Sequence, residues 1–198
     1  MQDQYWTIDR ETSWEVKIER SLFIAQIREV ENEQEAKAFI QQISQQHKQA
    51  THNCSAYRVG WGPQEITYAD DDGEPSGTAG RPILGAILSS GITNVAIVVT
   101  RYFGGKKLGV RGLIEAYGQT AGEVIQLAGK QEKLLQDKLE ITCSYAALNQ
   151  VLYWLEKYQA QVQERIYIEE VCLQFLVRQK NKEDLIELLK DHGNLKIL

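Results

Sequence analysis

Apolar residues follow two different spacings along the first two thirds of the chain. Where they occupy every second position or form a short β-branched run they predict a strand, and where they recur every three or four positions they predict a helix with one buried face. The predicted strands cover residues 14–18, 22–30, 54–59, 65–69 and 94–101. The predicted helices cover residues 32–46, 78–90 and 109–128. This mixture predicts an α+β domain.

The residues at the ends of these helices support the assignment. Asn32 and Thr78 stand where an N-cap is expected, because their short polar side chains accept hydrogen bonds from the first backbone N–H groups. Gly91 and Gly129 directly follow the last helical residues, as C-cap glycines do.

The last third of the chain has a different texture, since Gly193 is the one glycine left after residue 130. Its apolar pattern predicts, in order, a strand at residues 134–143, a helix at 146–158, strands at 161–168 and 171–178, a helix at 182–191 and a strand at 195–198. The βαββαβ order is that of the ferredoxin-like fold. The sequence therefore predicts two domains, residues 1–134 and residues 135–198.

A glycine-rich, cationic segment lies in the middle of the chain. Of the 15 glycines, 11 fall between Gly73 and Gly122, and glycine serves where backbone takes positive φ or approaches another group closely. Between Pro75 and Ile114 there is no carboxylate, although about five would be expected from the chain-wide frequency. The same segment carries five cations: Arg81, Arg101, Lys106, Lys107 and Arg111. This composition favours a surface that receives anions.

Composition limits the class of protein. A net charge of −5 argues against a protein that coats nucleic acid without specificity. The apolar runs are too short to span a bilayer, and polar residues after Met1 do not form a secretory signal. Three cysteines without a CxxC pair suit reduced thiols. We therefore expect a cytoplasmic protein without membrane contact.

Three motifs in a fixed order resemble the signature of the YigZ/IMPACT family. They are HNCSAYR at residues 52–58, DDGEPSGTAG at 71–80 and TRYFGG at 100–105. The resemblance covers residues 15–130 strongly and the tail more loosely. Two positions depart from the family pattern, because Arg111 replaces a glycine and Glu115 replaces a common arginine. The cation count is kept, but its position shifts by about one helical turn.

The resemblance implies both a fold and a role. It implies a first domain with a left-handed βαβ core, shared with a ribosomal protein and with domain IV of elongation factor G. The second domain is implied to be similar to the ferredoxin-like domain V of that factor. The eukaryotic relative regulates translation by binding a ribosome-associated activator of an initiation-factor kinase. For the bacterial members a translational role is an analogy from fold.

The first candidate site is the cationic loop after the strand at residues 94–101. Glycines let backbone N–H groups approach phosphate, the following helix directs its positive end there, and aromatic rings stack on bases. The candidate residues are Arg81, Arg101, Tyr102, Phe103, Gly104, Gly105, Lys106, Lys107 and Arg111. The alternative is a glycine-shaped turn with solvated lysines and core aromatics.

The second candidate site is the acidic run before the helix at residues 78–90. Clustered carboxylates hold Mg²⁺ or transfer protons, and a nearby histidine contacts ligands. The candidate residues are His52, Asp71, Asp72, Glu74 and Thr78. The alternative is a turn and a helix cap that pair with Arg81 or Arg101. The sequence predicts no catalytic residue, no metal site and no cofactor.

Three function hypotheses follow, and the oligomeric state stays open. The first is a non-enzymatic, translation-linked regulator that binds RNA, the ribosome or a ribosome-associated partner through the cationic loop. The second is an enzyme or binder of a phosphorylated small molecule that uses the same loop together with Asp72 and Glu74. The third is a module that binds proteins alone.

Overall fold

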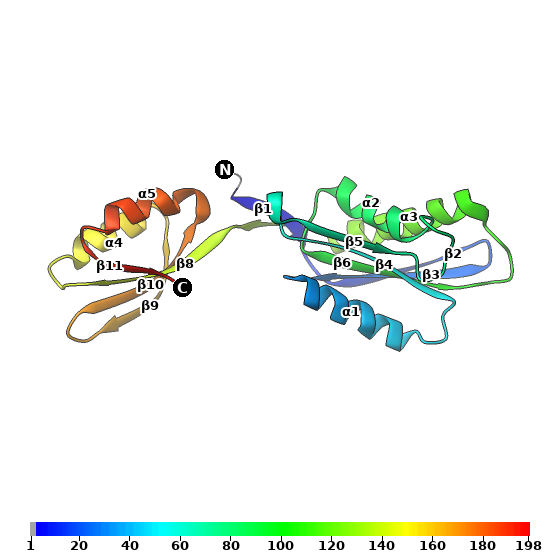
Figure 1. Ribbon diagram of the computed structural model, residues 1–198, viewed down its shortest axis with the longest axis horizontal. Helices are drawn as coiled ribbons and strands as arrows, with labels where there is room; N and C mark the ends of the chain where they lie inside the picture. The colour runs from blue at the N-terminus through cyan, green and yellow to red at the C-terminus, as the bar shows by residue number, and fades with distance from the viewer. Residues whose placement is uncertain (1–2) are drawn as a thin grey trace. The chain divides into compact units, whose positions relative to one another are not determined.

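The computed structural model describes residues 3–198, which form two compact units (Figure 1). The first unit is Trp6–Glu132, and the second consists of residues 3–5 and Lys133–Leu198. Both units combine helices with antiparallel sheets, which confirms the predicted two-domain α+β fold. The predicted domains assigned the whole start of the chain to the first domain, whereas residues 3–5 lie in the second unit.

The first unit contains a five-stranded antiparallel sheet between two layers of helices. Its strands in spatial order are β2 (Thr12–Ile18), β3 (Ser21–Glu29), β6 (Val95–Tyr102), β4 (His52–Val59) and β5 (Ile66–Asp70). The helix α1 (Glu33–Gln46) covers one face, and α2 (Gly80–Ser90) and α3 (Gly109–Ala128) cover the other (Figure 1).

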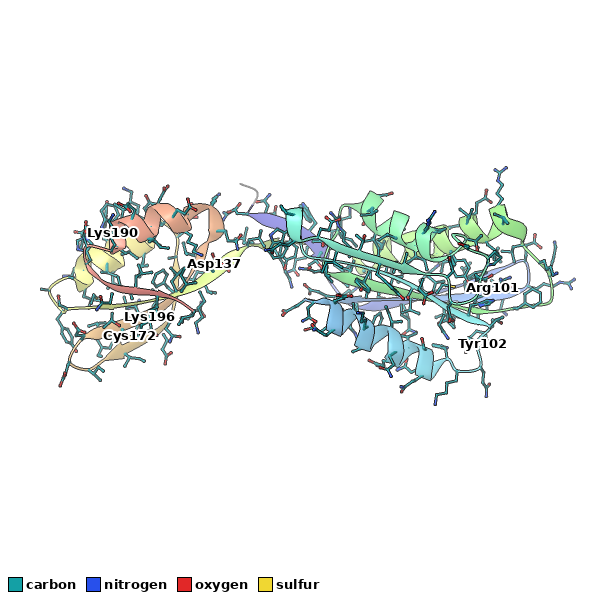
Figure 2. The ribbon with its side chains drawn as sticks, viewed as in Figure 1. Arg101, Tyr102, Asp137, Cys172, Lys190 and Lys196 are labelled. Carbon is teal, nitrogen blue, oxygen red and sulfur yellow. The ribbon has the colours of Figure 1, made fainter. Side chains whose placement is uncertain are left out.

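The central strand β6 explains why the unit has two cores. All of its residues from Val95 to Arg101 are buried, as expected for a strand covered on both faces. Successive side chains point to opposite faces, so Ile97 packs beneath α2 and α3 while Val98 packs beneath α1. The strand ends where Arg101 and Tyr102 lead into the cationic loop, and both are labelled in Figure 2.

The helix ends show which capping predictions were right. Asn32 caps α1, since its Oδ1 accepts a hydrogen bond from the Glu35 N–H at 2.9 Å, and Gly91 ends α2 at φ 72°. The prediction for Thr78 was wrong, because α2 begins at Gly80 and the Thr78 hydroxyl donates to the Pro75 carbonyl at 2.6 Å. A carboxylate from elsewhere caps α2 instead, as described below.

The second unit has the βαββαβ order that the sequence predicts. Its elements are β8 (Gln136–Cys143), α4 (Leu148–Lys157), β9 (Gln161–Tyr167), β10 (Val171–Arg178), α5 (Gln179–Leu189) and β11 (Gly193–Ile197). The sheet runs β11-β8-β10-β9 with every pairing antiparallel, which is the ferredoxin-like arrangement. Leu139, Ile141 and Phe175 lie in the core that α4 and α5 close.

Two strands were missing from the sequence prediction. β1 (Gln4–Ile8) and β7 (Lys130–Leu134) form a separate two-stranded sheet. The predicted strand at residues 134–143 combined the end of β7 with β8. A short 3-10 turn, η1 (Gly62–Gln64), joins β4 to β5. Within residues 3–198, none of the helices is both long enough and apolar enough to cross a membrane.

Candidate functional site

The cationic loop, residues 103–108, connects β6 to α3 at one end of the first unit. The pairing register places His52 of β4 and Phe23 of β3 on either side of Arg101. Arg101 and Tyr102 therefore point to opposite faces of the sheet. Tyr102 lies on the α1 face, where its hydroxyl is 3.0 Å from Nδ1 of His47.

Arg101 is held in a buried ion pair. Its guanidinium donates to Oε1 of Glu74 at 2.6 Å, and the two side chains are only 6% and 4% exposed. The rings of Phe23 and Phe103 lie 5.5 and 5.4 Å from the guanidinium carbon. Since removing either partner leaves an unpaired buried charge, the pair is costly to open. The Arg101 charge is therefore neutralised inside the fold.

Glu74, a member of the second candidate site, also accepts a hydrogen bond from Tyr117 and faces His52. The hydroxyl of Tyr117 donates to the same Oε1 at 2.8 Å, and burial, together with Cys54 and Glu74, raises the pKa of Tyr117. His52 Nδ1 lies 2.7 Å from the Asp72 carbonyl, which only accepts, so Nδ1 carries the hydrogen. Its Nε2 faces Glu74 Oε2 at 3.9 Å. Neither Tyr117 nor Cys54 was among the candidate residues.

Asp71 caps α2 from a distance. Its Oδ1 accepts from the N–H groups of Ala79 (3.0 Å) and Gly80 (2.8 Å), and its Oδ2 accepts from Gly77 (2.7 Å). Burial alone would raise the pKa of Asp71, but the hydrogen bonds from Gly77, Gly80 and Ala79 outweigh it and hold the pKa below its ordinary value. The acidic group that meets the helix dipole is thus a structural cap.

The side chain of Asp72 likewise accepts a hydrogen bond from a backbone N–H group. Its Oδ2 accepts the Asn53 N–H at 2.6 Å, which ties the acidic run to the start of β4. With Asp71 on α2 and Glu74 on Arg101, the three carboxylates point to three different partners. Within residues 3–198, no three His, Cys, Asp or Glu side chains lie close enough together to hold a metal ion.

Two other cations of the segment form exposed ion pairs. Lys106 pairs with Glu19, which lies in the turn between β2 and β3. Arg111 Nε lies 2.8 Å from Glu115 Oε1, one turn further along α3. The two departures from the family pattern therefore compensate each other. Because both pairs are exposed to solvent, each contributes little to the stability of the fold.

Lys107 and Arg81 are the remaining cations, and both are exposed. Neither forms an ion pair with a residue in the described part of the chain. Phe103 is 45% exposed beside the loop, so part of its ring is accessible. Phe103, Lys106, Lys107 and Arg111 are therefore exposed in the loop and the first turn of α3, and Arg81 is exposed in the first turn of α2, while Arg101 is buried.

Gly104 serves packing. A Cβ at this position would lie 1.9 Å from the carbonyl oxygen of Arg20, so only glycine fits. The Gly104 N–H is 3.3 Å from the Ser21 hydroxyl, and the Phe103 N–H donates to the Thr51 hydroxyl at 3.0 Å. Gly105, at φ 88° with open space around it, supplies the turn. The glycines thus fix the loop against the β2–β3 turn.

The comparisons with known proteins agree with the motifs. The family model "Impact N-terminal domain" matches residues 19–125, and a model described as "Domain of unknown function (DUF1949)" matches residues 141–194. The IMPACT family member YvyE of Bacillus subtilis (strain 168) is 39% identical over 194 residues, which cover 98% of this chain and 89% of YvyE. The chain belongs to the IMPACT family.

Two further relatives extend the comparison. The IMPACT family member YigZ of Escherichia coli (strain K12) is 34% identical over 134 residues, or 67% of this chain and 65% of YigZ. A solved structure titled "Crystal structure of an hypothetical protein" aligns over 100% of this chain and 98% of its own, with 26% identity and a TM-score of 0.70. The two-unit architecture is therefore shared by a protein of known structure.

Proposed function

We propose that the protein is a translation-linked regulator in the cytoplasm that binds RNA or the ribosome through an exposed cationic surface. This surface consists of Arg81, Phe103, Lys106, Lys107 and Arg111. The carrying observation is that Lys106 and Lys107 are exposed in the cationic loop, Arg111 is exposed in the first turn of α3, and Arg81 is exposed in the first turn of α2. Membership of the IMPACT family supports the translational role, since the resemblance implies such a role for the eukaryotic member.

The exposed cations of this surface can exchange their carboxylate partners for phosphate groups of RNA at small cost. The Lys106–Glu19 and Arg111–Glu115 pairs are exposed, so a phosphate replaces either carboxylate at small cost. No side chain of the described residues caps the start of α3, which leaves its first N–H groups available to an anion. Arg101 has no such freedom, because its buried pair with Glu74 does not exchange.

The structure gives less support to the phosphorylated-metabolite hypothesis. That hypothesis needs Asp72 and Glu74 to bind Mg²⁺ or to move protons. Asp72 accepts a backbone hydrogen bond from Asn53, and Glu74 neutralises Arg101. A protein partner on the ribosome is compatible with the same surface, so the test below separates RNA from protein binding.

The first prediction concerns sedimentation with ribosomes from the source cells. We expect the tagged protein to co-sediment at low salt and to be released as salt rises. The Lys106→Ala, Lys107→Ala double variant should bind more weakly and lower the salt slope by about two contacts. The matched control, Lys190→Ala with Lys196→Ala, removes the same charge from the second unit and should behave as wild type.

Two results would contradict this proposal. The first is absence of the wild-type protein from every ribosomal fraction at low salt. The second is equal loss of binding in the control variant, because the effect would then follow net charge alone. If binding survives nuclease digestion of exposed RNA, the surface contacts a protein partner.

A further inference from the structure

The edge strand β5 (Ile66–Asp70) is exposed along its whole length. It pairs with β4 on one side and has no strand of the described chain on the other. All five of its residues are solvent-exposed, although α2 packs against one face of the strand. An edge of this kind presents backbone N–H and C=O groups that can pair with an added strand.

The composition of β5 does not protect this edge. Proteins block exposed edges with charged residues or proline, and the other three edges of the two large sheets follow this rule in part. β2 carries Glu15 and Lys17, β9 carries Glu164 and Arg165, and β11 carries Lys196. The β5 sequence, ITYAD, has neither lysine nor proline and reaches a charge only at its last residue. The strand is therefore chemically suited to pairing.

A groove of about 390 Å³ opens at the start of β5, beside the first turn of α1. Its apolar lining includes Val59, Trp61 and Ile66, and the last two are 38% and 45% exposed. Glu31 and Glu33 line the same groove. The groove thus combines an aromatic ring with two carboxylates.

The charge of this groove selects its ligand. Glu31 is exposed, and Glu33 accepts from Lys37 Nζ and the Tyr57 hydroxyl, both at 2.8 Å. Among the residues that the structure describes, Lys37 is the one cation that forms an ion pair with an acid of the groove, and it lies outside the lining. Trp61 supplies a ring on which a cation stacks favourably. A lysine or arginine side chain therefore fits this groove better than an acidic or neutral one.

We propose that β5 and this groove bind an extended basic peptide segment of a partner protein. The segment adds a sixth strand to the sheet and places one lysine or arginine between Glu31, Glu33 and Trp61. Main-chain pairing supplies affinity and the groove supplies specificity, as in other strand-addition complexes. A second copy of the chain pairing through β5 is a poor occupant, because β5 carries no lysine or arginine to place in the groove.

The side chains of β5 add a further requirement. Ile66 and Tyr68 share the α1 face of the sheet, where Tyr68 stacks on Tyr57 with ring centroids 5.0 Å apart at 13°. Residues on one face of an added strand recur every second position. We therefore expect an apolar residue two positions away from the cation, packed against Tyr68.

This surface is separate from the proposed RNA surface. The groove lies at the Val59 end of β4, whereas the cationic loop lies at the His52 end. Seven residue steps along a strand span roughly 23 Å. The proposal therefore does not depend on nucleic-acid binding, and the Lys106→Ala, Lys107→Ala variant should retain it.

The test is selection of a phage-displayed library of random octapeptides on the full-length protein. We expect enriched sequences to carry lysine or arginine at one position and an apolar residue two positions away. A synthetic peptide of the most enriched sequence, titrated into ¹⁵N-labelled protein, should shift amides of β5 and the groove. Ile66→Lys should weaken this peptide about tenfold or more.

Matched variants make the result specific. Ile166→Lys introduces the same change at an exposed isoleucine on the edge strand β9 and should bind as wild type. Glu31→Lys should weaken binding in a salt-dependent way, whereas Glu123→Lys, an exposed site on α3, should not. Circular dichroism melts establish that each variant is folded.

Several outcomes would overturn the proposal. They are failure to enrich any sequence, enrichment without cations, amide shifts confined to other surfaces, and unchanged binding by Ile66→Lys. A dimer in sedimentation equilibrium that Ile66→Lys dissociates would assign the edge to a second copy and would equally reject the basic peptide.

Discussion

Asp71 shows how a carboxylate of an acidic run can serve as a helix cap. It accepts three backbone N–H groups, from Gly77, Ala79 and Gly80, and so fixes the acidic run to the start of α2. A motif dense in acids invites a metal or catalytic interpretation. Here the acid instead satisfies donors that α2 would otherwise leave unpaired.

We predict that Asp71→Asn lowers the free energy of unfolding by about 1–2 kcal/mol at pH 7. Burial raises the pKa of Asp71, but the backbone hydrogen bonds hold it below its ordinary value in the folded state. Its contribution is therefore present above that ordinary value and is lost as pH falls through the folded-state pKa. The difference between variant and wild type should therefore shrink in acid. Urea titrations between pH 2.5 and 7 measure it.

Asp9→Asn is the control for this experiment, because Asp9 is an exposed aspartate of the same unit. It should leave the pH profile unchanged. A pH-independent loss in Asp71→Asn would contradict the role of the charged carboxylate.

The cations show what sequence could not reveal at this scale. The absence of acids from residues 75–114 predicted a surface that receives anions, yet Arg101, Lys106 and Arg111 each have a carboxylate partner. Glu74 and Glu19 precede that window in the chain, and Glu115 follows it directly. Counting charges along a chain does not detect pairs formed across strands, so the burial of Arg101 required the structure.

At the scale of elements, two glycines of α2 differ in what surrounds them. Gly80 lies where α2 approaches β5, and a Cβ there would be 2.5 Å from the Asp70 nitrogen. A Cβ added at Gly85 would have nothing within 4 Å, and the backbone of Gly85 is ordinary helix. The same residue type thus serves close packing in one turn and has no such function in the next.

We predict that Gly80→Ala destabilises the first unit by about 1–3 kcal/mol, because the backbone of α2 or β5 must shift. Gly85→Ala should stabilise it by about 0.5–1 kcal/mol, since alanine loses less entropy in a helix. Chemical denaturation of both variants gives the comparison. Destabilisation of similar size in both would show that α2 tolerates no added methyl group.

Elements with strong periodicity were predictable, and those held by distant contacts were not. The spacing of apolar residues predicted α3 at residues 109–128 and β10 at residues 171–178, both as observed. β1 and β7 were not predicted because their sequences, QYWTI and KQEKL, lack a clear alternation of apolar and polar residues. A two-stranded sheet of this kind depends on pairing between segments more than 120 residues apart, which local pattern cannot report.

At the scale of the whole molecule, the second unit is built from two segments that are far apart in the sequence, residues 3–5 and Lys133–Leu198. Asp3 accepts from Arg178 Nε at 2.7 Å and from a second guanidinium nitrogen at 3.1 Å. The Asp3 carbonyl also accepts the Leu135 N–H at 2.7 Å. The hydrogen bond from Arg178 holds the pKa of Asp3 below its ordinary value. The change in glycine content predicted two domains but gave no indication of this contribution.

We predict that Asp3→Asn loosens the second unit and leaves the first unchanged. Arg178, the last residue of β10, would lose its bidentate partner, and β8 pairs with β10. Amide hydrogen exchange should therefore become faster in β8 and β10 and stay constant in β3 and β6. Asp191→Asn, at an exposed aspartate of the second unit, is the control. Equal acceleration in both units would contradict the assignment of residues 3–5.

The Asp3–Arg178 pair also limits the order in which the two units can fold during synthesis. The two residues are separated by 175 positions, so a ribosome adding about 5–20 residues per second makes Arg178 roughly 9–35 s after Asp3. The Trp6–Glu132 unit is made in full before Arg178 and can begin to fold first. Asp3 is thus made well before its partner Arg178, and a chaperone has that time to act on it.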